Sequence, residues 1–293
     1  MKSDLPDVFP ALYIVSTPIG CLTDISLRAL NVFKKGNIIL SEDTRKTKHL
    51  LNLCEIDYKK KKILKYNDFD FNNEKKREYI VNEIKNGSVV VLVSDAGTPL
   101  IADPGFKLVR KIIEQKCSII SIPGPCALIS ALVVSGLPTD SFFFSGFIPK
   151  KKLERKKFFK KLKKINSTLI FYESPKRIIQ SLVAISNIFG PDINVVICKE
   201  LTKKFEEIKR DKIINLIAEY SENTFLKGEH IILLENNVKE NISEEEIISQ
   251  LMKIPSSTSM KDKVNIVTKK MEISRKKVYE TALKINSKSN FNG

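Results

Sequence analysis

Short runs of apolar residues, many of them β-branched, alternate along most of the chain with segments whose apolar residues recur every three or four positions. The clearest run covers residues 89–93 (VVVLV), with Asn86-Gly87 before it and Ser94-Asp95 after it. Such runs are typical of buried strands, whereas the other spacing is typical of amphipathic helices. Continuous apolar strands joined by helices predict an α/β fold whose first sheet is mostly parallel and covered on both faces.

Residues 1–122 are expected to form a first α/β domain. Asp24 is suited to the N-cap position and should begin the helix that follows the first strand. A polar turn at 41–45 should open a second helix that runs through Leu53. The remaining expectations are strands at 12–16, 37–41, 63–64, 89–93 and 118–122, and helices at 74–86 and 105–115.

The alternation repeats over residues 123–238, which predicts a second α/β domain. We expect strands near 167–172, 193–198 and 229–235, and helices near 175–188 and 212–222. Beyond Asn241 no strand pattern remains. Residues 243–246 (SEEE) resemble a capping box that opens a helix, and two further helical stretches follow. Residues 239–293 are therefore expected to form a small helical C-terminal module.

Three loops at the ends of predicted strands are rich in Gly, Pro and small hydroxyl residues: 16–20 (STPIG), 94–105 (SDAGTPLIADPG) and 123–127 (PGPCA). In an open parallel sheet such loops meet at one edge, where Gly permits close approach and helix N-termini favour an anionic group. They predict a ligand pocket. No phosphate-binding G-x-x-x-x-G-K-[ST] or dinucleotide-binding G-x-G-x-x-G motif is present. Asp95 and Asp103 flank the central loop, where Asp often staples the backbone.

The chain is strongly basic, with 50 Lys and Arg against 34 Asp and Glu and a net charge of +16. Such charge favours a polyanionic partner. Abundant Lys, Ile and Asn also fit an AT-rich genome, so both interpretations stay open. The basic segment 150–164 (KKKLERKKFFKKLKK) predicts a helix with a narrow apolar stripe that includes Leu153. It is either a solvated surface helix or a contact to RNA phosphates.

Other classes of protein fit the sequence poorly. No apolar stretch is long enough to span a membrane, and the N-terminus lacks the apolar core of a signal peptide, so we expect a cytoplasmic protein. Five scattered cysteines without a C-x-x-C pair indicate free thiols. With only His49 and His230, we expect neither a metal site nor a Ser-His-Asp triad.

The loops, and further blocks that follow them in order, resemble the signature blocks of the ribosomal RNA small subunit methyltransferase I family, within the tetrapyrrole methylases. The resemblance spans about residues 10–236, and 279–283 extend it. The blocks are 12–20 with Leu22 and Asp24, 41–45, 94–105, 123–125 with Ala127, 135–140, 146–149, 171–175, 200–203 with 206–207, and 228–229.

The resemblance implies two α/β domains of the tetrapyrrole-methylase type and a homodimer, with S-adenosyl-L-methionine in the cleft between the domains. The implied reaction is 2'-O-methylation of a cytidine in the decoding region of 16S rRNA, within the small ribosomal subunit. A corrin C-methyltransferase of the same fold and a non-catalytic RNA-binding protein are the alternatives. The former has no use for the basic segment, and the latter needs no intact cofactor loops.

The resemblance also assigns residues. Cys21, Lys176 and Lys199 depart from the Asn, His and Arg that are usual there, and Cys21 lacks the donor and acceptor of an amide. The implied cofactor contacts are Pro18, Asp95, Gly97, Thr98, Ile101, Ala102, Pro125, Cys126, Ala127, Tyr172, Leu201, Thr202, Glu229 and His230.

The weak ribose nucleophile gains from a nearby proton acceptor, for which four acids in the family blocks are candidates. They are Glu42, Asp43, Glu173 and Glu200, and for each a helix cap or an ion pair is the alternative. Lys199 is expected to stabilise a developing alkoxide. The residues expected to bind RNA are Arg45, Lys151, Lys152, Arg155, Lys156 and Arg177.

Overall fold

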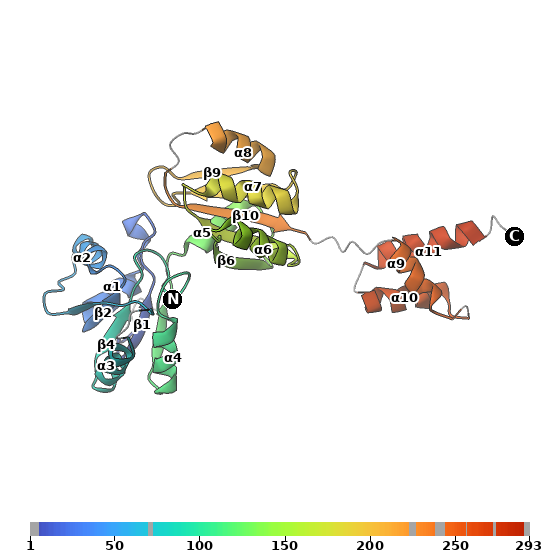
Figure 1. The fold of residues 1–293 in the computed structure, drawn as a ribbon. Coiled ribbons are helices and arrows are strands. Elements are labelled where there is room, and N and C mark those ends of the chain that lie inside the picture. The colour runs from blue at the N-terminus through green and yellow to red at the C-terminus, as the bar shows by residue number, and fades with distance from the viewer. Residues whose placement is uncertain are drawn as a thin grey trace. The chain divides into compact units, whose positions relative to one another are not determined.

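The computed structural model describes residues 6–69, 73–222, 227–237, 244–255, 257–271 and 274–289. Contacts between Cα atoms divide the chain into two compact units, Met1–Asn236 and Asn237–Gly293 (Figure 1). The first unit holds two five-stranded sheets, and the second is helical. The expected fold class is confirmed. The domain boundaries at 122/123 and 238/239 stay predictions, although each sheet takes its strands from one side of residue 123.

The first sheet is parallel throughout, with strand order β3-β2-β4-β1-β5. β1 lies between its two neighbours, so that Leu12 is opposite both Val90 and Ile119. Because all strands run the same way, their carboxyl ends meet at one edge. The strands are β1 (Ala11–Val15), β2 (Ile38–Ser41), β3 (Lys62–Lys65), β4 (Val89–Leu92) and β5 (Ile119–Ile122).

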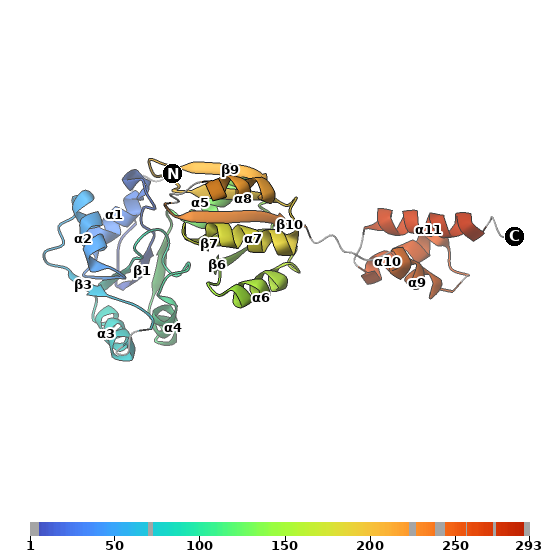
Figure 2. The same cartoon turned by 45° about the horizontal axis from the view of Figure 1, so that its top comes forward.

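Helices cover both faces of this sheet (Figure 2). Successive side chains of a strand point to opposite faces, so Tyr13 joins one core with Phe33, while Leu12 joins another with Leu108. This double burial explains why the strands are apolar at nearly every position. The helices are α1 (Leu27–Lys35) and α2 (Thr44–Leu53) on the first core, and α3 (Asn73–Lys85) and α4 (Phe106–Glu114) on the second.

The expectation that Asp24 caps the first helix is wrong. A short 3-10 helix, η1 (Leu22–Asp24), precedes α1, and Ser26 caps α1 by accepting a hydrogen bond from the Ala29 N–H at 3.0 Å. Ser serves this position as well as Asp does, so the extra turn moves the cap by two residues.

The second sheet is mixed, with order β6-β7-β10-β8-β9. Only β6 and β7 are parallel, while β10 is antiparallel to both β7 and β8. The sequence did not predict β6 (Phe142–Phe147) or β9 (Glu207–Lys212). Both are edge strands: β9 (EIKRDK) carries charges without apolar alternation, and the register of β6 shifts between Phe144 and Phe147. The inner strands are β7 (Ser167–Glu173), β8 (Asn194–Lys199) and β10 (His230–Asn236).

Four helices pack on this second sheet. Three of them, α6 (Lys152–Leu162), α7 (Ile178–Phe189) and α8 (Ile213–Glu222), bury one face around Phe159 and Phe171. On the other face α5 (Ala127–Ser135) packs together with Ile19 from the first half of the unit. The loops of the first sheet thus lie against the second sheet. The expectation that Leu153 belongs to the apolar stripe of α6 is wrong, since it is 76% exposed and the buried positions are Arg155, Phe159 and Leu162.

The second compact unit consists of α9 (Glu244–Met252), α10 (Met260–Met271) and α11 (Arg275–Ser289) around a core that includes Ile247, Val264 and Val278. This confirms the expected helical module. The expected capping box begins at Ser243, which lies outside the described residues. Within the described parts of the chain, no helix has the length and apolar character needed to cross a membrane.

Asn236 holds the end of α6 in place and provides a test of the fold. Its buried amide donates to the carbonyls of Leu162, Lys163 and Ile165 at 3.2, 3.1 and 2.6 Å. Asn236→Ala leaves buried carbonyls unsatisfied, so we expect it to lower the free energy of unfolding by about 2–3 kcal/mol. Urea denaturation measures this, with Asn82→Ala on an exposed face of α3 as the control. Equal midpoints for both variants would contradict the assigned role.

Candidate functional site

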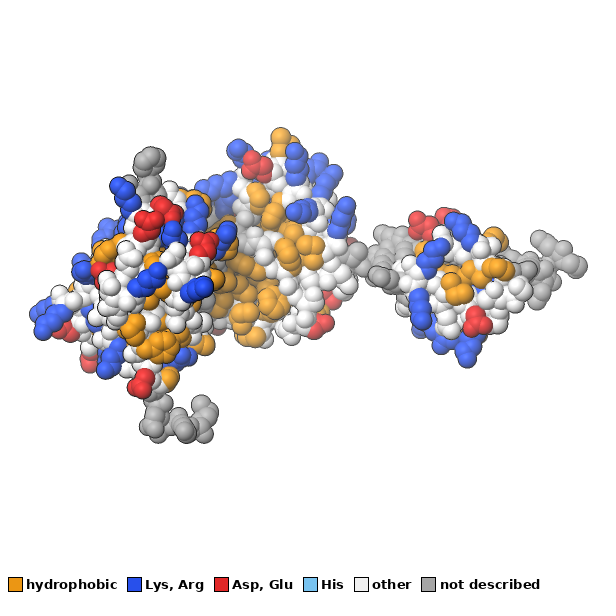
Figure 3. Space-filling model, turned by 90° about the horizontal axis from the view of Figure 1, so that it is seen from below, with side chains coloured by type: hydrophobic (Ala, Val, Ile, Leu, Met, Phe, Trp, Pro, Cys, Tyr) orange, Lys and Arg blue, Asp and Glu red, His pale blue; other side chains and the backbone are white. Residues whose placement is uncertain are grey.

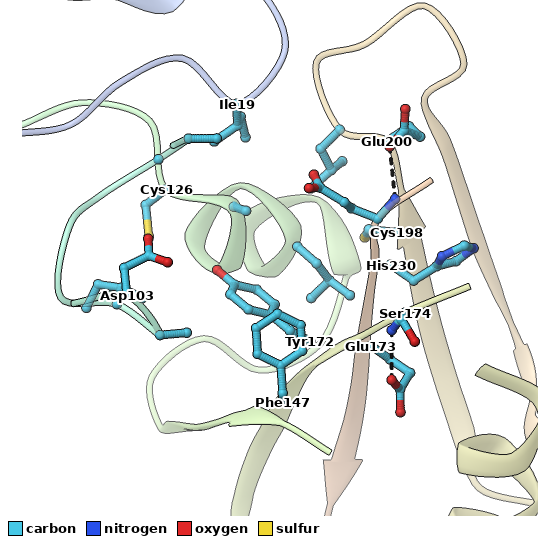
Figure 4. Close-up of a pocket in the computed structure, with 18 of the residues that line it drawn as sticks. Ile19, Asp103, Cys126, Phe147, Tyr172, Glu173, Ser174, Cys198, Glu200 and His230 are labelled. Carbon is cyan, nitrogen blue, oxygen red and sulfur yellow. Dashed lines mark hydrogen bonds between the residues drawn. The ribbon is translucent and has the colours of Figure 1, made fainter. Parts of the chain in front are cut away.

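A pocket of about 310 Å³ lies where the loops of the first sheet face the second sheet (Figure 4). Ile19, the 96–98 turn and 101–103 line it from the first half, together with the start of α5 at Cys126 and Ala127. The second half contributes Phe147, 172–175, 198, 200–201 and 229–231. The sequence expectation of a pocket at the carboxyl ends of parallel strands therefore corresponds to a real cavity.

Hydrogen bonds join the three Gly/Pro loops to one another. Thr17 and Gly97 exchange backbone N–H···O bonds of 2.9 and 3.0 Å. The Thr98 hydroxyl donates to the Pro125 carbonyl at 2.9 Å and lies 2.9 Å from the Ser16 hydroxyl. Gly97 has φ 79, where a side chain is strained, and an added Cβ would approach Ile19 to 3.3 Å. The glycine is thus required for the loops to close around the pocket.

Backbone strain gathers at the pocket. Six described residues other than glycine have positive φ, and four of them belong to two loops: Leu100 and Ala102 in one, Glu200 and Thr202 in the other. Ala102 and Glu200 line the pocket from opposite sides. Left-handed conformations of such residues are uncommon and persist where the surroundings impose them, often at functional sites.

The pocket combines apolar walls with free backbone donors. Tyr172 packs edge-on against Phe144 and Phe147, with ring centroids 4.8 and 5.5 Å apart. Burial raises the pKa of the Tyr172 hydroxyl, which therefore stays a neutral donor. No described side chain caps α5 at Cys126, and the Leu128 N–H interacts with the Tyr172 hydroxyl, so the other N–H groups of this first turn are the ones left for an anionic group.

Strand register decides which predicted residues reach the pocket. In the second sheet Tyr172, Ile231 and Cys198 form one cross-strand row, and these three line the pocket. The next row contains Glu173, His230 and Lys199, which point to the opposite face because side chains alternate along each strand. The prediction that these three side chains act on a ligand is therefore not supported by their placement.

Each member of that row has a structural environment of its own. His230 is 2% exposed, lies edge-on to Tyr220 and has its Nδ1 3.0 Å from the Gly228 carbonyl. Burial lowers the pKa of its imidazole. Lys199 lies 3.4 Å from the Glu207 carboxylate. His230 borders the cavity, but Figure 4 shows its ring turned away from it.

Glu173 is held by three partners. Its carboxylate accepts from the Ser174 N–H at 2.7 Å and the Ser181 hydroxyl at 2.5 Å, and pairs with Arg177 at 2.6 Å. Arg177 also donates to the Ser174 hydroxyl and to the Ile148 carbonyl. The structure therefore shows Glu173 in an ion pair, which was the alternative to its role as a base. Arg177, expected to bind RNA phosphate, is instead bonded to groups of the protein.

The other acids differ in their surroundings. Asp43 caps α2 and pairs with Arg45 at 2.7 Å, and hydrogen bonds from Arg45 hold the pKa of its carboxyl well below the usual range. Burial alone would raise the pKa of Glu200, but hydrogen bonds from Glu229 N–H and Lys203 lower it overall. Burial raises the pKa of Glu42, which does not line the pocket. None of the three combines a raised pKa with a place in the pocket.

Asp103 combines a raised pKa with a place in the pocket, whereas its sequence position predicted only a side chain that binds its own loop backbone. It lies beside Cys126 on the wall formed by the first half (Figure 4). Burial, and next the nearby Glu42 carboxylate, raise the pKa of Asp103 to about 7. The sequence signal was its position at the end of the central loop, but its burial depends on packing between distant segments.

The remaining predicted contacts divide into two groups. Pro18, Asp95, Pro125 and Thr202 do not line the pocket. Asp95 instead accepts from the Asp43 N–H and from Lys46, and Thr202 accepts from the Cys21 N–H at 3.1 Å. That bond uses the backbone of Cys21, so the missing amide does not abolish it. The second group of predicted cofactor contacts does line the pocket and consists of Gly97, Thr98, Ile101, Ala102, Cys126, Ala127, Tyr172, Leu201, Glu229 and His230.

Comparison with known proteins identifies the family. Residues 11–217 match the model of the Tetrapyrrole (Corrin/Porphyrin) Methylases. The chain is 46% identical over 228 residues, 78% of its length and 79% of the relative's, to "Ribosomal RNA small subunit methyltransferase I" of Rickettsia prowazekii. It is 39% identical over 283 residues, 94% of its length and 97% of the relative's, to the protein of that name in Buchnera aphidicola subsp. Schizaphis graminum. The chain belongs to this family of tetrapyrrole methylases.

Solved structures agree on the fold. The chain matches a diphthine synthase with a TM-score of 0.57 and 15% identity, covering 76% of this chain and 89% of that one. It matches a cobalt precorrin-4 methyltransferase with a TM-score of 0.54 and 18% identity, covering 76% and 93%. At such identities the likeness concerns the fold alone. Together with the family, it establishes this protein as a methyltransferase.

The raised pKa of Asp103 predicts a pH-dependent stability. Between about pH 4, where the unfolded carboxyl titrates, and about pH 7, the folded state binds more protons, so stability falls as pH rises. Asp103→Asn removes this titration, and we expect it to stabilise the protein by about 2 kcal/mol at pH 8 but little at pH 4, less than the full shift implies because the site is partly hydrated. Urea denaturation of both proteins at the two pH values measures the difference. A difference independent of pH would contradict the assignment.

Proposed function

We propose that this methyltransferase uses S-adenosyl-L-methionine to methylate the ribose 2'-hydroxyl of a cytidine in the decoding region of 16S rRNA, in the cytoplasm. The observation that carries the proposal is the pocket at the carboxyl ends of the first sheet, in a chain whose relatives are named for ribosomal RNA of the small subunit. The ribose, the cytidine and its region follow from the resemblance of the sequence blocks.

The residues present suit the cofactor. Its carboxylate matches the N–H groups at the start of α5, which no described side chain caps, and its adenine matches apolar walls that include Ile101, Leu201 and Ile231. S-adenosyl-L-methionine supplies an electrophilic methyl group on a sulfonium. The chain's part is to align a nucleophile with that group and to exclude water, which the aromatic side of the pocket around Tyr172 favours.

Asp103 is the proton acceptor that the site supports best. With S-adenosyl-L-methionine in the pocket as methyl donor, the Asp103 carboxylate would accept the proton of the ribose hydroxyl whose oxygen receives the methyl group. A base whose pKa lies near 7 is matched to this step. Among the other acids bordering the pocket, Glu173 faces away and Glu200 is held by Lys203. Glu229 is 82% exposed and also pairs with Lys203.

The proposed base predicts a specific kinetic signature. We expect Asp103→Asn to slow single-turnover methylation by about 10²-fold or more, and the wild-type kcat/KM to rise with pH to a plateau above about pH 7. Glu200→Gln is the control, expected to lose less than about tenfold. Calorimetry of cofactor binding shows whether the variant still binds the donor. Full-rate methylation by Asp103→Asn with an unchanged pH profile would rule out this base.

The target is tested by mapping ribose methylation. Small subunits from cells lacking this gene should accept one methyl group on a ribose of 16S rRNA when incubated with the protein and labelled donor. Mass spectrometry of nuclease fragments locates it. A label on a base, or transfer to a corrin precursor but not to RNA, would contradict the proposed substrate.

We also propose that the protein acts as a homodimer, because large apolar side chains are exposed on neighbouring elements of the second sheet. Val133 on α5 is 68% exposed, and Phe142 and Phe143 on the edge strand β6 are 43% and 41% exposed. Figure 3 shows hydrophobic side chains gathered on one face of this half of the unit. Apolar surface of this kind favours association with a partner.

Light scattering after gel filtration tests the dimer. We expect twice the chain mass for the wild type and a monomer for Val133→Glu, because the new charge would be buried without a partner. Phe106→Glu, at a site 61% exposed on α4, should leave the dimer intact. A wild-type monomer at micromolar concentration would contradict the proposal.

A further inference from the structure

A second cavity, of about 740 Å³, lies in the groove between α6 and α7. It shares no lining residue with the methyltransferase pocket. On one side are Lys150, Lys152, Arg155 and Lys156, and on the other are Ile179, Gln180, Val183, Ala184, Asn187 and Ile188. The second side of the groove is formed by α7 alone. This helix begins at Ile178, three residues after Pro175, which lines the methyltransferase pocket.

Arg155 is the unusual member of this groove. It is only 5% exposed, yet its Nε and Nη1 have no hydrogen-bond partner among the described residues. Leaving a buried donor unsatisfied costs about 1–3 kcal/mol, and more for a charged group. The nearby Arg177 shows the contrast, since Glu173, Ser174 and the Ile148 carbonyl all accept from its guanidinium. Arg155 is thus a buried cation whose acceptor is not supplied by the described protein.

The charges around Arg155 also lack a counterpart. Lys150, Lys152 and Lys156 are exposed, and none of them pairs with a carboxylate in the part of the chain that the structure describes. Lys152 and Lys156 are four residues apart and share one face of α6. The described residues that line the groove include no acid, and Glu154 pairs with Lys151, which is outside the lining. Four adjacent cations without an anion indicate an anionic ligand.

The opposite wall narrows the chemistry of that ligand. Val183 is 41% exposed and lies beside Ile179 and Ala184, and the amides of Gln180 and Asn187 add donors and acceptors. A simple inorganic anion has no use for an apolar wall. A nucleotide unit of an RNA strand matches both sides, because its phosphate is anionic while its sugar and base offer apolar surface.

We propose that the α6/α7 groove binds the phosphate backbone of RNA, with Arg155 and the three lysines on phosphate oxygens and the α7 wall against the nucleotide. This inference rests on the proposed function for the identity of the polyanion. Pro175 at the pocket and Ile179 at the groove are four positions apart, at most about 14 Å of chain. The groove is therefore close enough to hold nucleotides near the one that enters the pocket.

Two double variants of equal charge test the groove. Lys152→Gln with Lys156→Gln removes two groove cations, whereas Lys157→Gln with Lys160→Gln removes two from α6 outside the lining. With a 16S rRNA transcript in filter binding, we expect the groove pair to lower affinity at least about tenfold and to reduce the slope of log K against log salt by about 2. The control pair should change affinity less than about threefold. Equal losses in both pairs, or no loss in either, would overturn the proposal.

Arg155 separates binding from structure. Arg155→Met keeps the aliphatic stem and removes the unsatisfied donors, so we expect weaker RNA binding with an unchanged or higher Tm. Arg155→Lys should restore part of the affinity, since it keeps the charge but not the planar fork. A lower Tm for Arg155→Met with unaltered RNA affinity would assign Arg155 a purely structural role and overturn the inference.

Further measurements keep this inference apart from the proposed function. The groove variants should bind S-adenosyl-L-methionine normally in calorimetry and methylate at the wild-type rate when RNA is saturating. If the wild type binds RNA through the groove but transfers no methyl group, the proposed function fails and the groove stands. If methylation occurs while groove variants bind RNA like the wild type, the groove alone fails. If the wild type bound phosphatidylserine vesicles through Lys152 and Lys156 but did not bind RNA through them, the inference about the groove would also be overturned.

Discussion

The antiparallel pairing of β10 with β7 and β8 determines which side chains the pocket receives. Tyr172, Ile231 and Cys198 occupy one row across these strands, and Glu173, His230 and Lys199 occupy the next. Because a strand alternates its faces, a shift of β10 by one residue would turn the His230 side chain toward the apolar cavity and Ile231 away from it. The aromatic packing of Tyr172 and the buried ion pair of Glu173 with Arg177 both stabilise the observed register.

Much of the fold follows from local pattern, and less of the site does. Runs such as VVVLV at 89–93 predicted the inner strands of the first sheet because both faces of that sheet are buried there, and the edge strand β3 was predicted from the short apolar pair Ile63-Leu64. β9 escaped prediction because it is a charged edge strand, and the cap of α1 moved from Asp24 to Ser26 because an extra turn intervenes. The resemblance assigned roles to Glu173, Lys199 and His230, of which the pocket lining includes Glu173 and His230. A sequence block does not say to which face of a strand a side chain points.

Asp103 is a site residue whose properties the local sequence does not predict. Its neighbours in sequence predict an ordinary loop aspartate, and its altered pKa arises from burial and from Glu42, sixty-one positions earlier in the chain. Glu42 follows β2 while Asp103 ends the loop after β4, and these strands are paired. Parallel pairing thus brings two carboxylates together at the carboxyl edge, and mutual repulsion adds to the effect of burial in keeping one of them protonated near neutral pH.

The two arginines near α6 and α7 show how one protein uses the same side chain in two ways. Arg177 ties the loop after β7 to the carbonyl of Ile148, so it fixes the segments between which the pocket and the groove lie. Its charge is balanced by Glu173 and contributes little to the field outside. Arg155 has no such acid, and its charge adds to that of the neighbouring lysines. The net charge of +16 alone did not distinguish genome bias from function. Arg155 is a separate observation, because drift toward Lys enriches exposed positions and does not by itself explain a buried Arg without a partner among the described residues.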